Sequence, residues 1–222
     1  MTNNNKPCHR HLMTDLAIIT LILLLLAVFQ SDTIFIAMHV ILSAYLVATQ
    51  RTGLLFPLAT ALLVSTTWIY LAQDYYAYDR SFLIIGNMNL WPWSAWVWSL
   101  FLVCYVYRGV EARYAIRGRL NRLLVFSLIF WFMLISAETF AYHSLGLVDI
   151  ATLKYEGLPL CDCIHGPGWM QAGYLALGPL YFILTRGLLL LASRARRSRW
   201  PHHQGNRRRH ALSYLISLIV RG

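Results

Sequence analysis

The sequence predicts an all-α, polytopic integral membrane protein with six transmembrane helices and both termini in the cytoplasm. Its 222 residues are 58% hydrophobic and only 13% charged, whereas a soluble domain carries about 25% charged residues. The apolar residues form long runs, near the length of roughly 20 residues that a hydrocarbon core of about 30 Å requires. The basic residues gather on alternate loops, as expected for loops on the cytoplasmic side of a membrane.

The first three spans are expected at residues 14–30, 33–48 and 53–72. The first run lacks the small-residue cleavage site of a signal peptide, so we expect it to be retained as a span. Only two residues separate it clearly from the second, which predicts a tight helical hairpin. Pro57 falls in the first turns of the third span, where proline is best tolerated.

The last three spans are expected at residues 90–107, 123–143 and 169–192. Pro179 lies inside the sixth and predicts a kink there. The six runs leave no room for a separate soluble domain, so residues 1–200 are predicted to form one six-helix transmembrane domain. Aromatic residues at the outer span ends suit the headgroup level and indicate an interfacial belt rather than a ligand-stacking site; they are Tyr75, Tyr76, Tyr78, Trp91, Trp93 and Trp169.

The charges set the predicted orientation. Bases fill the N-terminal tail, the second and fourth loops and the C-terminal tail; they include Lys6, Arg10, Arg51, Arg108, Arg113, Arg117, Arg119, Arg122, Arg194, Arg196 and Arg197. The other loops hold mostly carboxylates, with only Arg80 and Lys154 as bases. Because cytoplasmic loops carry the excess of lysine and arginine, both termini should be cytoplasmic in an inner membrane.

Residues 201–222 are predicted to be a basic cytoplasmic tail. Its apolar part follows Arg207 to Arg209 and is too short to span a bilayer. Such a segment suits a short helix lying on the inner leaflet, or a disordered tail. The net charge of +10 is spread beside apolar spans, which favours membrane lipids as partners over nucleic acid.

Glu138 is the first candidate functional residue, because a carboxylate within a span normally faces the bundle interior or a wet cavity. Helical geometry places it about 7 Å below the outer end of the fifth span. His143 ends that span, roughly 140° away around the helix, so each side chain needs a partner from another element. The alternative for Glu138 is a purely structural hydrogen bond between helices.

The last outer loop supplies the expected partners, with Cys161, Asp162, Cys163 and His165 within five residues. Three chemistries fit this spacing. The two cysteines and His165 could bind zinc or copper. The cysteines could form a redox disulfide, or Asp162 and His165 could act as acid and base. The alternative is a structural capping loop whose cysteines are buried as small hydrophobic residues.

His39 is expected in the same outer half as these residues, about 10 Å down the second span. The predicted candidate catalytic residues are therefore Glu138, His143, Asp162 and His165, at the outer leaflet. They suit an enzyme that acts on a lipid, isoprenoid or quinone-like substrate entering from the bilayer. The alternatives are a non-catalytic subunit associated with other membrane subunits, and a small transporter, against which the paucity of polar residues in the inner half argues.

Overall fold

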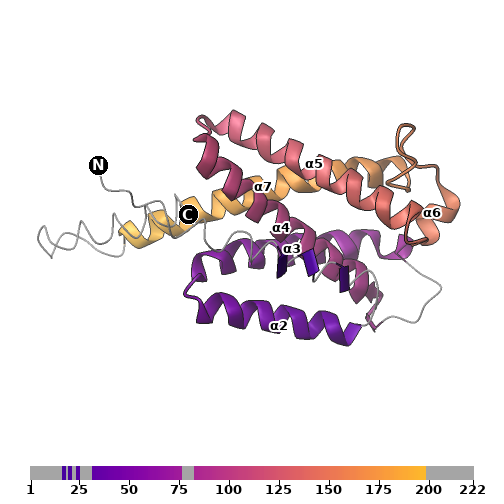
Figure 1. Ribbon diagram of the computed structural model, residues 1–222, viewed down its shortest axis with the longest axis horizontal. Helices are drawn as coiled ribbons and strands as arrows, with labels where there is room; N and C mark the ends of the chain where they lie inside the picture. The colour runs from indigo at the N-terminus through magenta and orange to yellow at the C-terminus, as the bar shows by residue number, and fades with distance from the viewer. Residues whose placement is uncertain (1–16, 19, 22–23, 26–31, 77–82, 199–222) are drawn as a thin grey trace, which may run out of the picture.

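The computed structural model describes residues 17–18, 20–21, 24–25, 32–76 and 83–198 (Figure 1). Most of the first expected span and all of the tail 201–222 lie outside the described residues. The elements follow in chain order as α2 (Asp32–Ala48), η1 (Thr52–Leu54), α3 (Leu55–Ala72), η2 (Gln73–Tyr75), β1 (Ile84–Ile85), β2 (Met88–Asn89), α4 (Leu90–Tyr114), α5 (Arg119–His143), α6 (Ile150–Lys154) and α7 (Gly168–Ser198).

Four segments of the described chain are long and apolar enough to cross a membrane: Thr52–Tyr75, Leu90–Tyr114, Arg119–His143 and Gly168–Leu191. The helices expected in these four regions are confirmed, and so is a shorter apolar helix of 17 residues, α2. The protein is therefore mostly helical, as expected of a membrane protein. Its short β1–β2 hairpin, which turns at Gly86 with φ of 65°, was not foreseen by the all-α prediction.

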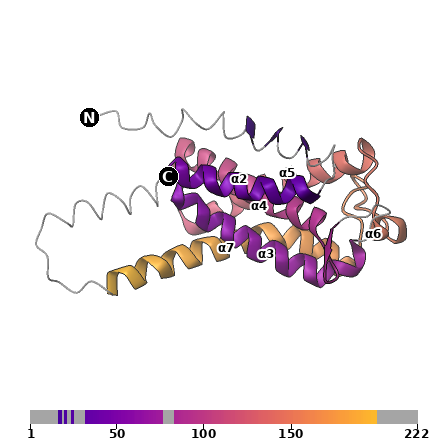
Figure 2. The same cartoon turned by 90° about the horizontal axis from the view of Figure 1, so that it is seen from below.

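The long helices lie side by side, with α4 at the centre (Figures 1 and 2). Helix α4 packs against α3 and α5, while α7 packs against α5 and α3, and α2 contacts α4. The α4 side chains of Val97, Trp98 and Leu100 are fully buried. This central position explains why the tryptophan-rich run is a core helix throughout much of its length rather than only an interfacial belt.

Helix α5 is peripheral and has two distinct faces. Phe126, Phe130 and Leu134 recur every four residues and are buried in the bundle. Another series with the same spacing is exposed and apolar: Leu120, Leu124, Leu128 and Phe132. Residues four apart share one face of a helix. An apolar stripe pointing away from the bundle suits contact with lipid chains, because every exposed side chain of the series is hydrocarbon.

Two glycines let α7 approach its neighbours closely. A Cβ atom on Gly173 would lie 2.4 Å from the Trp68 ring of α3, and one on Gly178 would lie 2.2 Å from the Phe130 ring of α5. Small residues serve this purpose at helix contacts within membranes. The close approach therefore depends on the missing side chains.

Pro179 is accommodated inside α7 by a neighbouring helix. Proline has no amide hydrogen, so it cannot donate to the carbonyl four residues earlier, which belongs to Leu175. The indole Nε1 of Trp131 in α5 donates to that carbonyl oxygen at 2.8 Å. A side chain from α5 thus replaces the missing helical hydrogen bond.

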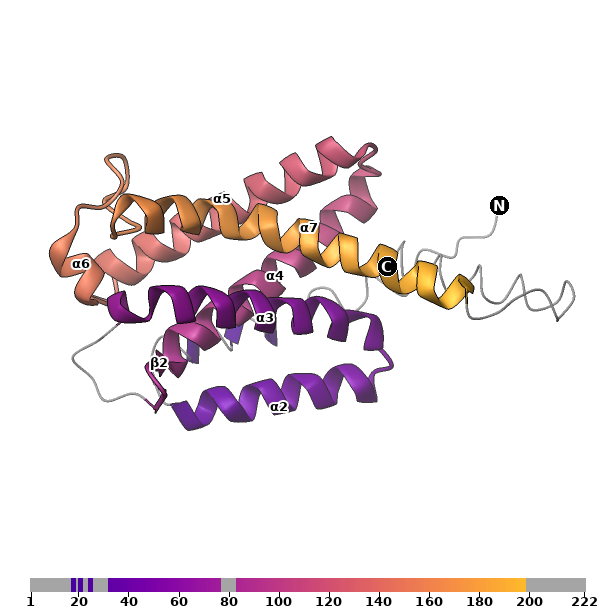
Figure 3. The same ribbon diagram turned by 180° about the vertical axis from the view of Figure 1, so that it is seen from behind.

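The helices end in two contrasting groups of residues. At the arginine end, defined by Glu111 of α4, Arg122 of α5 and Arg186 of α7, one carboxylate joins three helices. Glu111 lies 3.0 Å from Arg122 Nε and also accepts a hydrogen bond from Arg186. The Arg186 guanidinium in addition lies 5.5 Å from the centre of the Phe182 ring. The cysteine end, residues 142–171, surrounds α6 at the other end of α5 (Figure 3).

Candidate functional site

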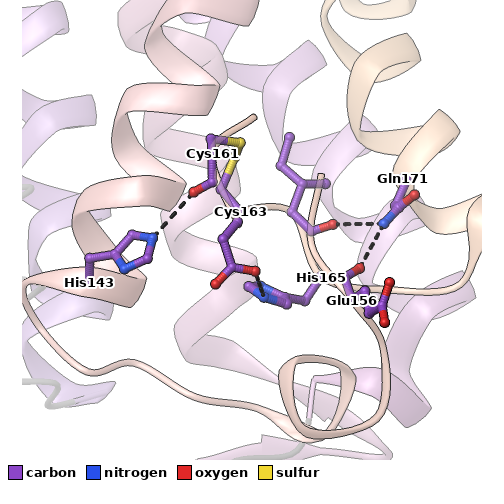
Figure 4. The surroundings of a disulfide bond; sticks show 8 residues. His143, Glu156, Cys161, Cys163, His165 and Gln171 are labelled. Carbon is purple, nitrogen blue, oxygen red and sulfur yellow. Dashed lines mark hydrogen bonds and ion pairs between the residues drawn. A yellow bond between two sulfur atoms is a disulfide. The ribbon is translucent and has the colours of Figure 1, made fainter. Parts of the chain in front are cut away.

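The loop that carries both cysteines folds back on itself between α6 and α7. The backbone N–H of Leu158 donates to the carbonyl of Cys163 at 2.8 Å, and the N–H of Asp162 donates to the carbonyl of Leu158 at 2.9 Å. From α7, Gln171 Nε2 donates to the carbonyls of Glu156 and Ile164 (Figure 4). The segment is therefore a compact turn, held by hydrogen bonds at both of its ends.

A disulfide joins Cys161 and Cys163, as Figure 4 shows. Cys163 is fully buried, whereas Cys161 is half-buried. Closing a ring of three residues removes little freedom from the unfolded chain, so the chain-entropy estimate gives about 1.6 kcal/mol, against about 4.7 kcal/mol for a loop of about 100 residues. The bond thus contributes little to global stability by this mechanism.

The backbone around the disulfide takes an unusual conformation. Asp162 has φ of 44° and Ile164 has φ of 57°, both in the left-handed region. Aspartate tolerates this region, but for a β-branched residue such as isoleucine it is a rare outlier. The loop also requires Gly157, since a Cβ there would lie 2.7 Å from the amide nitrogen of Cys163.

Asp162 and His165 form the polar pair that the sequence suggested. His165 Nε2 lies 3.2 Å from Asp162 Oδ1; the imidazole is only 8% exposed, whereas the carboxylate is 63% exposed. The pair rests against the end of α5, because the rings of Tyr142 and His165 have centroids 4.6 Å apart. The structure therefore places a mostly buried imidazole beneath a carboxylate that water can reach.

The His143 side chain also contacts the loop, at a backbone carbonyl of the loop. Its Nε2 lies 3.2 Å from the carbonyl oxygen of Cys161 (Figure 4). Partners in the last loop were expected for Glu138 and His143; His143 has one, at the Cys161 carbonyl. The His143 side chain itself is exposed.

Glu138 lies one helical turn before Tyr142 on the same face of α5 and is half-buried. Within the part of the chain that the structure describes, it makes no hydrogen bond to another helix or to the cysteine loop. Its electrostatic neighbours are Asp149, the N-cap of α6, and the buried Tyr76 and Tyr174. Asp149 in turn interacts electrostatically with His165, so it links Glu138 to the Asp162–His165 pair.

Asp149 is a member of this group that the sequence analysis did not single out. Its Oδ1 accepts hydrogen bonds from the backbone N–H of Thr152 at 2.8 Å and from the Thr152 hydroxyl at 2.7 Å. The Asp149 backbone N–H donates to Thr152 Oγ1 in return, which completes a capping box. Burial raises the pKa of the Asp149 carboxyl above its ordinary value, while the Thr152 hydrogen bonds and His165 oppose the shift. The available signal was an Asp-x-x-Thr pattern before a short apolar segment.

A buried aromatic cluster beside the site was also missed. The Tyr76 hydroxyl accepts hydrogen bonds from the indoles of Trp68 and Trp96, both at 3.0 Å, and donates to the hydroxyl of Tyr174 at 2.6 Å. The aromatic cluster, as we call these four residues, is buried where α3, α4 and α7 meet. Tyr76 was expected at the headgroup level, and its burial follows from hydrogen-bonding partners that lie 8, 20 and 98 residues away in the sequence.

His39 is separate from the cysteine loop. Its ring stacks on Trp93 with centroids 5.3 Å apart and lies 5.1 Å from the Trp98 ring, so it belongs to the contact between α2 and α4. His39 and His165 were both expected in the outer half, but they do not belong to one cluster of side chains.

The metal hypothesis for Cys161, Cys163 and His165 depends on the oxidation state of the loop. In the disulfide the two sulfurs are bonded to each other, and a thiolate is the form that binds a metal. The described residues contain no group of three or more His, Cys, Asp or Glu side chains arranged to hold an ion. Zinc or copper binding thus remains a prediction for a reduced loop.

The site presents an acid–base pair, Asp162 and His165, with two further carboxylates, Glu138 and Asp149, near it. Such a set can take a proton from a polar group and return it, because histidine and carboxylate side chains are the usual proton carriers in enzymes. No protein-family model, curated protein sequence or solved structure matches this chain. The chemistry of the site is accordingly argued from its own geometry.

Proposed function

We propose that the chain is an inner-membrane protein of six spans with both termini in the cytoplasm. The arginine asymmetry supports this orientation, because positive residues stay on the cytoplasmic side. In this arrangement the arginine end lies inside and the cysteine end lies at the outer leaflet. The apolar stripe along α5 would face the lipid chains.

We further propose that the cysteine end is the active site of an enzyme acting on a lipid, isoprenoid or quinone-like substrate. The observation that carries this proposal is the Asp162–His165 pair, with its sheltered imidazole and accessible carboxylate. His165 would transfer the proton and Asp162 would orient the imidazole. His143 and Glu138 would contact the polar end of the substrate, and the hydrocarbon part would remain in the bilayer.

The test uses the full chain in lipid nanodiscs prepared from the total lipid extract of the expressing cells. Lipids are extracted after incubation and compared by mass spectrometry between wild type and the double variant Asp162→Asn, His165→Gln. We expect the wild type to convert a lipid component and the variant to leave it unchanged while it remains folded. The matched control is Asp74→Asn, Glu156→Gln, which alters two exposed carboxylates. Equal conversion by all three proteins would refute the assignment.

A non-catalytic subunit of a membrane complex is the second candidate. Within the described residues, α2 carries a wide, shallow apolar groove lined by His39, Val40, Ser43, Ala44, Val47 and Ala48. Ser43, Ala44 and Ala48 have small side chains, which suit close packing of another helix. Replacing Ala44 with leucine should release a bound subunit during purification, whereas an isolated enzyme would keep its lipid conversion.

A further inference from the structure

We propose that the Cys161–Cys163 pair is a thiol–disulfide exchange site that accepts two electrons from a dithiol at the cysteine end. This inference does not depend on the proposed lipid chemistry. It rests on three features of the loop: unequal access to the two cysteines, a left-handed Asp162 inside the closed ring, and hydrogen bonds that hold the loop independently of the disulfide.

The two cysteines differ in accessibility. Cys161 is half-buried, whereas Cys163 is fully buried beside Ile164. An attacking thiolate has to reach one sulfur, and access decides which sulfur it reaches. Attack is therefore directed to Cys161, and Cys163 is the leaving group.

Opening the ring releases the backbone restraint between the cysteines. Asp162 lies between the two cysteines and has φ of 44°, in the left-handed region that is unfavourable for most residues with a side chain. With the sulfurs separated, the ring no longer restrains this residue. The dithiol form of the loop thereby gains conformations that the disulfide form lacks, which favours reduction.

The fold around the loop does not rely on the disulfide. Gln171 of α7 holds the carbonyls of Glu156 and Ile164, and Leu158 holds the carbonyl of Cys163. Ile164 and Met170 are buried beneath the loop. These contacts involve neither cysteine sulfur, so a reduced loop can remain in place for reoxidation.

The exchange balances as follows. A thiolate of the dithiol attacks Sγ of Cys161, the Cys161–Cys163 bond breaks, and Cys163 leaves as a thiolate that takes a proton from water. The second thiolate of the dithiol then attacks the first sulfur of the same dithiol, which is bonded to Cys161 in the mixed disulfide. This attack releases the Cys161 thiolate, which takes a proton from water. The dithiol becomes a disulfide, and the protein gains two electrons and two protons.

The first experiment uses the full chain in nanodiscs, with Cys8→Ser and Cys104→Ala to remove the other thiols. The protein is treated with dithiothreitol, labelled with a polyethylene-glycol maleimide and resolved by gel shift. We expect two thiols to appear together without denaturant, and oxidised dithiothreitol to remove them again. Thiols that appear only after denaturation would overturn the proposal and leave a purely structural disulfide.

The second experiment tests the direction of attack with two matched variants in the same background. Cys163→Ser leaves Cys161 free, and Cys161→Ser leaves Cys163 free. With glutathione disulfide, Cys161 should form a mixed disulfide roughly tenfold faster than Cys163, because reaction follows accessibility. Equal rates, or a faster Cys163, would contradict the assignment. Neither experiment measures lipid conversion, so a failure here is distinguishable from a failure of the proposed enzyme.

Discussion

The arginine end and the cysteine end of the bundle are stabilised in different ways. At the arginine end, one carboxylate joins three helices: Glu111 in α4 contacts Arg122 in α5 and Arg186 in α7. At the cysteine end, the Asp162–His165 pair and the disulfide connect residues two or three positions apart. One end fixes the arrangement of the helices, and the other shapes a single loop against them.

This difference predicts that changes at the two ends have different effects on folding. Changes at the arginine end should affect assembly of the whole bundle, because the interactions cross between helices. Changes to Asp162, His165 or the disulfide should leave the bundle folded, because these interactions join residues two or three positions apart, while Gln171 of α7 holds the loop through its backbone carbonyls. A loop that can be altered without unfolding the scaffold is a suitable place for a reactive site.

The largest effect is expected from Glu111→Gln. This change leaves Arg122 and Arg186 facing each other without a counter-charge, and the Glu111 side chain is only 17% exposed. The Arg122 and Arg186 side chains are 40% and 30% exposed, so we expect a loss of about 2–3 kcal/mol, below the range of about 3–5 kcal/mol for a fully buried pair. Thermal unfolding in detergent should show the loss, and Glu156→Gln, an exposed carboxylate, is the control. Equal stability of both variants would show that the arginine end does not hold the helices together.

A somewhat smaller effect is expected from Tyr76→Phe, which tests whether the scaffold beneath the cysteine end also relies on contacts between helices. The change leaves the indole N–H groups of Trp68 and Trp96 without their acceptor. Each unsatisfied buried group costs about 1–3 kcal/mol, so two such groups at the lower end of this range give a total near 2 kcal/mol. The comparison is Tyr70→Phe, whose ring is exposed. A variant as stable as this control would refute a stabilising role for the aromatic cluster.

The smallest effect is expected at Asp149, where the capping hydrogen bonds stabilise the carboxylate and burial destabilises it. Asp149→Ala removes the acceptor for Thr152 and should cost about 1 kcal/mol. Asp149→Asn keeps an acceptor and removes the charge, so it should cost less than alanine. Unfolding temperatures of the three proteins in detergent would rank them, and an asparagine variant as unstable as alanine would contradict the capping role.

The same residue predicts a pH dependence. Because burial raises the pKa of Asp149 in the folded protein, the folded form retains a proton that the unfolded form has already lost. The stability contribution of this group therefore falls as the pH rises from the ordinary aspartate value through the raised one. Measured from about pH 4 to about pH 7, the asparagine variant should gain stability relative to wild type. A constant difference between the two would contradict the assigned shift.

The sequence predicted the helices because their apolar runs match the length of a membrane span. It also identified the cysteine loop, since Cys161, Asp162, Cys163 and His165 are adjacent along the chain. It did not reveal the contacts of Glu111 or Tyr76, because their partners lie in other helices and the spacing along one helix carries no information about them. The oxidation state of the cysteines was open for a similar reason: C-x-C spacing alone permits a disulfide, a metal site or two thiols.

The position of the two ends on opposite sides of the membrane is the central claim, and cysteine labelling tests it directly. Arg117→Cys at the arginine end and Glu156→Cys at the cysteine end are introduced separately into a chain whose native cysteines are replaced. Intact cells are treated with a membrane-impermeant maleimide. We predict that the cysteine at position 156 is labelled at once and that the cysteine at position 117 is labelled only after the membrane is permeabilised. Labelling of position 117 in intact cells, or of both positions alike, would contradict the account.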